Sequence, residues 1–339
     1  MFCRLKKSSV KPKMFHSEPI LSDIYNDDAI STVKVLVLQL SDKAKIDYIM
    51  KFLSAKLPMT KISLDHLKRI NSKQGNFQII VSKIRESSCE MDVDLIQKTI
   101  DEMDYDLREF LHGFDPDNLC IREVAASSPL TRNQFKRLSS LWPINFFEDQ
   151  YIAKCLDGSI FSPNYWKQIH ELMMETLNML NNDSSRMSAI IVKDDCKRIV
   201  TKTISRIDQH PLDHAVINAV TNVSEIHRQV KKRLLEDPDS FQCDNNINHY
   251  KDDYLCTKYD CFLSQEPCIM CAMALVHSRI RRVFFYDSKT LSSTTIVNKC
   301  HDQPYTVEKL HTSPFLNHRY EVWKLSKPEI FANKKTKIV

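Results

Sequence analysis

Three side chains that bind soft metal ions stand where they could share one ion. His214 lies near the start of a predicted helix, and Cys268 and Cys271 form a Pro-Cys-x-x-Cys sequence at the start of another. One imidazole and two thiolates suit tetrahedral Zn²⁺ and leave a fourth position open. Helix N-termini also favour thiolates, because the helix dipole stabilises negative charge there. The sequence therefore predicts a zinc site of His214, Cys268 and Cys271.

This pattern is more specific than its parts. An isolated Cys-x-x-Cys pair often binds no metal, whereas a histidine at one helix start, followed by Pro-Cys-x-x-Cys after a strand, indicates a shared ion. We expect the fourth zinc position to be closed by water or by a group from the C-terminal tail. Beyond Cys300, that tail offers the imidazoles of His301, His311 and His318, carboxylates and the chain terminus.

Hydrophobic periodicity places the ligands in a layered domain that we expect over residues 164–325. A helix over 166–180 has an apolar stripe, and the pair Ser162-Pro163 is its candidate cap. A strand hairpin, a helix around His214 and a strand before the cysteines complete an α/β/α three-layer sandwich. The further expected elements are strands at 187–192, 199–204, 255–263 and 281–286, helices at 212–234 and 268–280, and an Asn/Asp-rich insertion at 236–253.

A separate α+β domain is expected over residues 31–110. The patterns of 32–40 and 77–84 predict strands, and those of 43–57 and 94–103 predict helices. This alternation suggests a ferredoxin-like arrangement. The remaining segments are expected to be a poorly ordered lead-in over 1–30, a linker with short helices over 111–163 and a basic tail over 326–339.

Composition excludes several classes of protein. The 339 residues are 42% hydrophobic, with no run of the roughly 18 apolar residues that a membrane helix needs, so no membrane association is expected. The three glycines, Gly75, Gly113 and Gly158, are too few for a P-loop or a GxGxxG fingerprint. Because the basic start lacks an apolar segment and the 11 cysteines are odd in number, we expect an intracellular, reducing location, in the nucleus, the cytoplasm or both.

Positive charge is concentrated in the N-terminal part. Residues 1–90 carry 16 Lys and Arg against 9 Asp and Glu, whereas the whole chain has a net charge of +5. This end suits a polyanion such as RNA, and Lys61, Lys68, Arg69 and Lys73 are the candidate phosphate contacts. The alternative is that these side chains form only a solvated surface.

A resemblance to a known family rests on residues 267–283. Their sequence, PCIMCAMALVHSRIRRV, resembles the PCxMCAxAxVHSRIxRV stretch of tRNA adenosine deaminases, and Leu316–Arg319 resembles the LNHR sequence near their C-terminus. The resemblance is specific over 188–325 and patchy over 33–150. Shorter segments at 64–70, 141–143 and 254–257 are similar to the non-catalytic subunit of the eukaryotic heterodimeric enzyme.

The resemblance implies a fold, a cofactor and partners. The fold would be cytidine deaminase-like with bound Zn²⁺, and the activity would be conversion of the wobble adenosine of tRNA to inosine. In such zinc deaminases an activated water attacks the ring carbon that carries the amine. A catalytic partner subunit would perform the reaction, and the domain over 31–110 would bind tRNA.

One departure from the family pattern decides the expected activity of this chain. Active members carry Glu two residues after the zinc histidine, and this chain carries Val216. Deamination needs a carboxylate to take a proton from zinc-bound water and pass it to the leaving amine. We therefore expect zinc without catalysis, and a partner with the intact His-x-Glu motif. The alternatives are an autonomous deaminase whose base comes from elsewhere, and a zinc-stabilised scaffold without an RNA role.

Residues around the motif have simpler interpretations. Glu266 is common in the family even beside an intact catalytic Glu, and Asp213 is expected to cap a helix. Cys256 and Cys261 are expected to be core thiols on a buried strand. The segment 270–279 is expected at or near the partner contact, where it would present an apolar patch or touch the substrate: Met273, Leu275, Val276, His277, Ser278 and Arg279.

Overall fold

The computed structural model describes residues 15–73, 75–84, 92–181, 183, 186–236, 253–287 and 303–326. The chain forms two compact units, one over residues 23–153 and one that combines residues 1–22 with 154–339. No helix among the described residues is long and apolar enough to cross a membrane.

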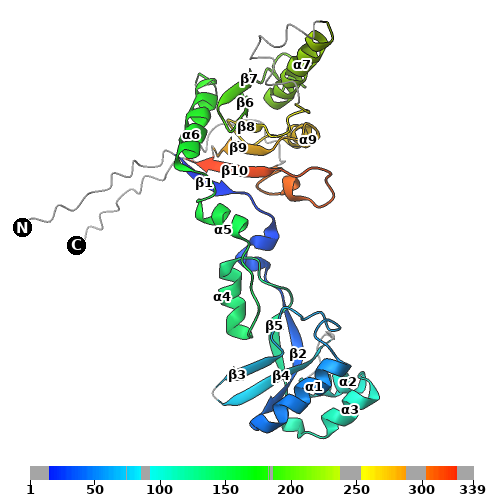
Figure 1. The fold of residues 1–339 in the computed structure, drawn as a ribbon. Coiled ribbons are helices and arrows are strands. Elements are labelled where there is room, and N and C mark those ends of the chain that lie inside the picture. The colour runs from blue at the N-terminus through cyan, green and yellow to red at the C-terminus, as the bar shows by residue number, and fades with distance from the viewer. Residues whose placement is uncertain are drawn as a thin grey trace, which may run out of the picture. The chain divides into compact units, whose positions relative to one another are not determined.

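The unit over 23–153 contains a four-stranded antiparallel sheet in the order β3-β4-β2-β5. Its chain order is strand, helix, two strands, two helices and strand, which confirms the ferredoxin-like expectation. The strands are β2 (Thr32–Leu40), β3 (Ile70–Lys73), β4 (Asn76–Lys83) and β5 (Leu119–Ala125). The helices are α1 (Ile46–Lys56), α2 (Asp92–Asp101), α3 (Tyr105–His112) and α4 (Arg132–Leu141) (Figure 1).

Both faces of this sheet are covered. Leu36 and Leu38 point to a core built with α1, α2 and α3. Val35 and Val37, which alternate with them, pack instead against the 57–69 segment, α4 and Trp142. The Trp142 indole anchors this second layer, because it is 1% exposed and its Nε1 donates to the Lys68 carbonyl at 2.7 Å. Any ligand of this unit must therefore contact helices, turns or strand edges.

Two expected domain boundaries are wrong. The expected linker over 111–163 contains a short helix as predicted, α4, which begins with a Thr131/Gln134 capping box, but it also contains β5, which pairs with β2 along its whole length. The expected lead-in over 1–30 contains β1 (His16–Pro19), which pairs with a strand near the C-terminus of the chain. Both strands are short and polar in places, so their identity depends on partners distant in sequence. Residues 1–14 and the tail 327–339 lie outside the described residues.

The second unit is built on a six-stranded mixed sheet in the order β1-β10-β9-β8-β6-β7. Two strands form the expected hairpin, β6 (Ser188–Lys193) and β7 (Arg198–Ile204). The others are β8 (Asp260–Leu263), β9 (Arg282–Tyr286) and β10 (Glu321–Ser326). The sequence did not predict β10, and the expected strand over 255–263 is shorter because Leu255 and Lys258 have left-handed backbone angles in a turn.

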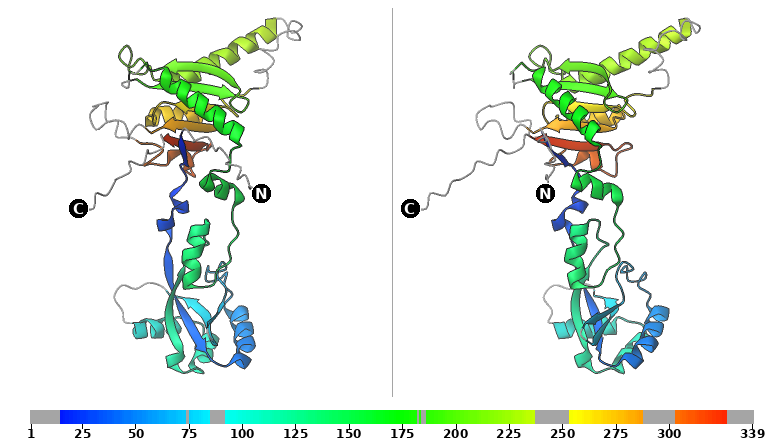
Figure 2. Two further views of the ribbon diagram at one scale, coloured as in Figure 1. Left: turned by 90° about the vertical axis from the view of Figure 1, so that its left-hand side faces the viewer. Right: turned by 60° about the vertical axis from the view of Figure 1, so that its left-hand side comes forward.

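Helices cover both faces of this sheet, as expected for an α/β/α sandwich. One face packs against α6 (Pro163–Asn178), with α5 (Gln150–Asp157) beside it, and the other against α7 (Ala215–Glu236) and α9 (Ile269–His277). Neighbouring residues such as Ile190 and Ile191 face opposite layers. Figure 2 shows α6 along one face of the sheet. The Ser162 hydroxyl caps α6, as predicted, by accepting from the Tyr165 N–H. Most of the expected insertion over 236–253 lies outside the described residues.

One buried histidine ties β1 to the rest of this unit. His311 is 2% exposed, and its Nε2 hydrogen-bonds the Ile20 carbonyl at 2.8 Å. Burial lowers the pKa of the imidazole to about 4, although the hydrogen bond to Ile20 raises it. Protonation of His311 is therefore disfavoured in the folded chain.

We predict that acid destabilises this unit through His311. The unfolded imidazole binds a proton near pH 6.5 and the folded one only near pH 4, so stability falls as pH drops through this window, by about 3 kcal/mol. Urea unfolding at several pH values should show this slope, and His311→Gln should flatten it. The exposed His277→Gln is the matched control, and an equal slope in both variants would contradict the assignment.

Candidate metal centre

His214 is fixed at the start of α7. Its carbonyl accepts the first helical bond, from Asn218 N–H at 3.0 Å. The preceding residue, Asp213, is held on both sides, because its carboxylate accepts from Arg206 Nε at 3.1 Å and from the Asn218 amide. Asp213 therefore lies one residue before the N-cap position of α7, and the bonds that its carboxylate accepts come from these two side chains and not from a backbone N–H of the helix.

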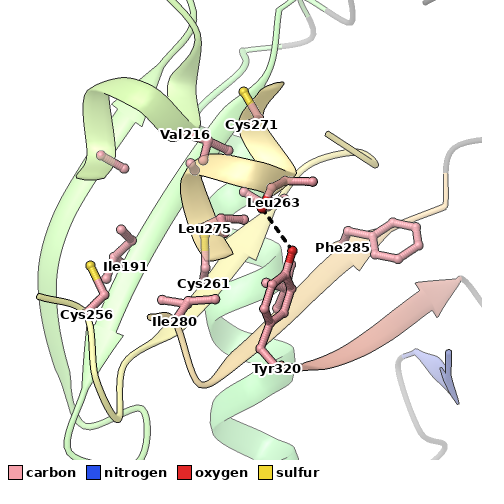
Figure 3. Packing of buried hydrophobic residues seen from close by; sticks show 14 of the residues in the cluster. Ile191, Val216, Cys256, Cys261, Leu263, Cys271, Leu275, Ile280, Phe285 and Tyr320 are labelled. Atoms are coloured by element: carbon pink, nitrogen blue, oxygen red, sulfur yellow. Dashed lines mark hydrogen bonds between the residues drawn. The ribbon is translucent and has the colours of Figure 1, made fainter. Parts of the chain in front are cut away.

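The two cysteines come from the turn that enters α9. Cys268 is the N-cap residue of this helix, and Cys271 lies in its first turn with a fully buried side chain. The His214 Nδ1 is 3.6 Å from the Cys268 Sγ and 3.5 Å from the Cys271 Sγ. All three ligand atoms lie within 4.8 Å of one another. The structure thus brings the three predicted ligands together, and Figure 3 shows one of them, Cys271, on α9.

The electrostatics of the cysteine pair favour one thiolate. The pKa of Cys268 falls to about 5, chiefly because it accepts a hydrogen bond from Cys271, and His214 also contributes. The pKa of Cys271 is raised, because its thiol donates to Cys268 and is buried. A half-buried thiolate beside a second thiol and an imidazole nitrogen fits a soft divalent metal, which would displace the remaining proton.

Val216 occupies the position where an active deaminase carries its acid/base. Its side chain is completely buried and packs with Ala215, Ala219 and Leu275 in the core between the sheet and the two helices. Figure 3 places Val216 beside Cys271. The site therefore has metal ligands, and at this position an apolar side chain in place of a carboxylate.

Glu266, two residues before Cys268, has a carboxylate that is engaged in structural hydrogen bonds. One oxygen accepts from the backbone N–H groups of Tyr305 and Thr306, at 2.9 and 2.8 Å, and the other accepts from the Thr306 hydroxyl at 2.8 Å. This agrees with the expectation that Glu266 is not a substitute base. The sequence contained no signal for its partners, which lie 39 and 40 residues away.

Two of the tail histidines considered as a fourth ligand are engaged elsewhere. His311 bonds the Ile20 carbonyl, and His318 Nε2 bonds the Ile280 carbonyl at 2.7 Å. Among the described residues, the group of side chains that could bind one metal ion consists of His214, Cys268 and Cys271, and it includes neither His311 nor His318. His301 and Cys300 lie outside the described residues.

The expected contact residues after Cys271 divide between core and surface. Leu275, Val276 and Ser278 are buried, so the expectation that they face a partner is wrong: a nine-residue helix packed on a sheet must turn one side inward. Met273 and Arg279 are half-buried, and His277 is exposed. Cys256 and Cys261 are both buried, as expected, although Cys256 lies in a turn and not on a strand.

The candidate phosphate contacts also divide. Lys61 and Lys68 are exposed. Lys73 is the last residue of β3, and its side chain is not among those that the structure describes. Arg69 is 7% exposed, and its guanidinium donates to the carbonyl of Leu57, the residue that ends α1. Burial lowers its pKa. Arg69 is therefore a helix-capping residue, and its assignment as a phosphate contact is wrong.

We predict that Arg69→Ala destabilises the 23–153 unit by about 2 kcal/mol, since a buried carbonyl loses a charged donor. Urea unfolding of the full chain is the measurement. The neighbouring exposed Lys68→Ala should change stability by less than about 0.5 kcal/mol. Equal stability of the two variants would return Arg69 to the candidate contacts.

We predict that Cys268→Ser removes the bound metal and lowers the yield of folded protein, whereas the wild-type chain contains about one zinc. Metal analysis of the purified chain checks both statements. Cys120→Ser, a free half-buried thiol on β5, is the matched control and should keep its zinc. A well-folded Cys268→Ser protein with full zinc would overturn the ligand assignment.

Similarity to known proteins agrees with this geometry. The family model "Cytidine and deoxycytidylate deaminase zinc-binding region" matches residues 164–287. Over 334 residues, 90% of each chain, the protein is 28% identical to "Probable inactive tRNA-specific adenosine deaminase-like protein 3" of Danio rerio. It is 24% identical to "tRNA-specific adenosine deaminase subunit tad3" of Schizosaccharomyces pombe, over 82% of this chain and 78% of that one. A solved structure from "Biochemical and Structural Studies of A-to-I Editing by tRNA:A34 Deaminases at the Wobble Position of Transfer RNA" is 16% identical, over 47% of this chain and 97% of its own, with a TM-score of 0.30. The chain is therefore similar over most of its length to proteins named as probable inactive tRNA-specific adenosine deaminase-like proteins, and its residues 164–287 match a cytidine deaminase zinc-binding region.

Proposed function

We propose that this chain is the non-catalytic, zinc-binding subunit of a heterodimeric tRNA adenosine deaminase that converts wobble adenosine to inosine. The observation that carries the proposal is a complete His214/Cys268/Cys271 ligand set beside a buried Val216. An intracellular location follows from the tRNA substrate.

The chemistry of the site supports a structural metal. In a deaminase, zinc activates a water for attack on the ring, and a nearby carboxylate must move the proton. Val216 cannot accept a proton, and Asp213 and Glu266 are held by the partners described above. His214, Cys268 and Cys271 would hold zinc and thereby tie the start of α7 to the start of α9.

A catalytic partner with an intact His-x-Glu motif is the second part of the proposal. The outward side of α9 offers a contact surface, because Met270 is 38% exposed and Met273 and His277 follow it at helical spacing. Next to this stripe lies a hollow of about 220 Å³ between α7, α9 and the 254–258 turn. Its lining residues are Val220, Ser224, Leu255, Cys256, Ala274, His277 and Ser278.

Binding of tRNA by the N-terminal α+β unit is the third part. A deaminase pocket receives one extruded base, so the rest of a large polyanion needs other contacts. Lys61 and Lys68 are exposed, and with Lys73 they remain candidates after Arg69 is removed. Because both faces of the sheet are covered, these contacts lie on turns and at the β3 edge.

We predict that the purified chain, loaded with zinc, forms no inosine from tRNA, and that activity requires the catalytic subunit. Conversion of adenosine at the wobble position, measured with each protein alone and with both together, is the test. Turnover by this chain alone would favour an autonomous deaminase.

As a test of the contact surface, Met270→Asp with Met273→Asp should reduce co-purification with the partner. The control is Ile199→Asp, on the edge strand β7, which should not reduce it.

We predict that Lys61→Glu with Lys68→Glu weakens binding of many tRNAs alike and makes affinity less dependent on salt, by about one unit of slope per lost phosphate contact. Binding to the assembled heterodimer should be measured at several salt concentrations. Exposed lysines on the other unit, Lys167→Glu with Lys197→Glu, provide the control. Unchanged affinity and slope in an intact complex would leave the Lys-rich surface as a solvated one.

A further inference from the structure

We infer that Glu266 and Tyr320 are positioning residues for the metal centre, which they support from the side of the sheet and the C-terminal segment. This inference rests on the zinc proposed above. Neither residue is a metal ligand. Each instead fixes backbone next to a ligand, one before Cys268 and one after Cys271.

Glu266 fixes the approach to Cys268. It lies between β8 and α9, two residues before the first thiol, where the chain has left the sheet and has not yet entered the helix. Its carboxylate gathers three donors from residues 305 and 306, at 2.8 to 2.9 Å. The Thr306 hydroxyl also lies 3.0 Å from a second acceptor, Gln303 Oε1, so that its single proton is shared between two oxygens. A turn that would otherwise depend on loop packing is therefore held at its centre by charge-assisted bonds.

Tyr320 fixes the turn of α9 that follows Cys271. Its hydroxyl donates to the Ala272 carbonyl at 3.1 Å, the dashed bond in Figure 3, and lies 2.9 Å from the Tyr305 hydroxyl. Both tyrosines are buried, at 6% and 0% exposure, and their rings meet edge to face with centroids 6.0 Å apart. Tyr305 also gives its backbone N–H to Glu266, so one residue links the two supports.

The two supports converge on the short stretch that carries both thiols. Cys268 and Cys271 are three residues apart, and they must present their sulfurs to the same His214 nitrogen. Hydrogen bonds around metal ligands orient them, and their removal typically costs 10–100-fold in metal affinity. The segment 303–320 therefore does more than fill the core, because it bonds the Glu266 carboxylate before the ligand pair and the Ala272 carbonyl after it.

The test is the rate at which a chelator removes zinc from the full-length chain. The chain is purified with its catalytic partner where its solubility requires this. Zinc release from the partner is then a second kinetic phase, which the substitutions should leave unchanged. Tyr320→Phe keeps the ring and removes one hydroxyl, and we expect zinc release to be about tenfold faster. Glu266→Ala should accelerate release by up to about 100-fold. Glu266→Gln, which can still accept the two backbone N–H bonds, should restore most of the retention. Cobalt-substituted protein should show a shifted ligand-field spectrum in Tyr320→Phe.

The control is Tyr165→Phe. This tyrosine is half-buried in the same unit and donates to the Asp260 carboxylate at 2.6 Å, at the opposite end of β8 from the cysteines. Its loss should lower thermal stability without changing zinc release or the cobalt spectrum. If Tyr320→Phe and Glu266→Ala release zinc at the rate of Tyr165→Phe, the inference is wrong although the metal centre stands. A wild-type chain that contains no zinc would overturn the metal centre and this inference together.

Discussion

The packing of α7 against the sheet next to α9 is the interaction on which the metal centre depends. The ligands come from two segments 54 residues apart, and no local sequence rule can hold them within bonding reach. Small residues line the shared core, Ala215 and Ala219 on one helix and Ala272 on the other, all with no exposed surface. Their size permits the helices to approach closely, and the ligands at the two helix starts then meet.

Val216 belongs to this same packing, which explains how the site can lose catalysis and keep its geometry. A carboxylate at a fully buried position needs hydrogen-bond donors or a proton to offset its desolvation. Valine needs neither, and burying its side chain contributes about 2 kcal/mol. Replacing a reactive group by an apolar one therefore strengthens the core that positions the metal ligands.

The sequence predicted what depends on local pattern. The helix around His214, the Ser162 cap of α6 and the turn into Cys268 all follow from periodicity or residue type within a few positions. The features that it did not reveal depend on distant partners. The strand β1 exists because β10 offers it an edge, and Arg69 is buried because the end of α1 needs a donor. Val276 and Ser278 follow the family motif, but only the packing of α9 shows that they face inward.

Both units place their sheets between packed layers, and this limits where function can reside. Many nucleic-acid-binding sheets leave one face open. In the N-terminal unit, Trp142 and its neighbours cover one face of the sheet, and three helices cover the other. In the unit that holds the metal ligands, the same arrangement leaves the outward side of α9 and the adjacent hollow as surface. A buried charged group, such as the Arg69 guanidinium, stabilises the fold and cannot contact a ligand. The proposed recognition of RNA and of a partner would therefore fall to side chains on turns and outward helix faces, such as Lys61, Lys68 and Met270, whose substitution would leave both cores undisturbed.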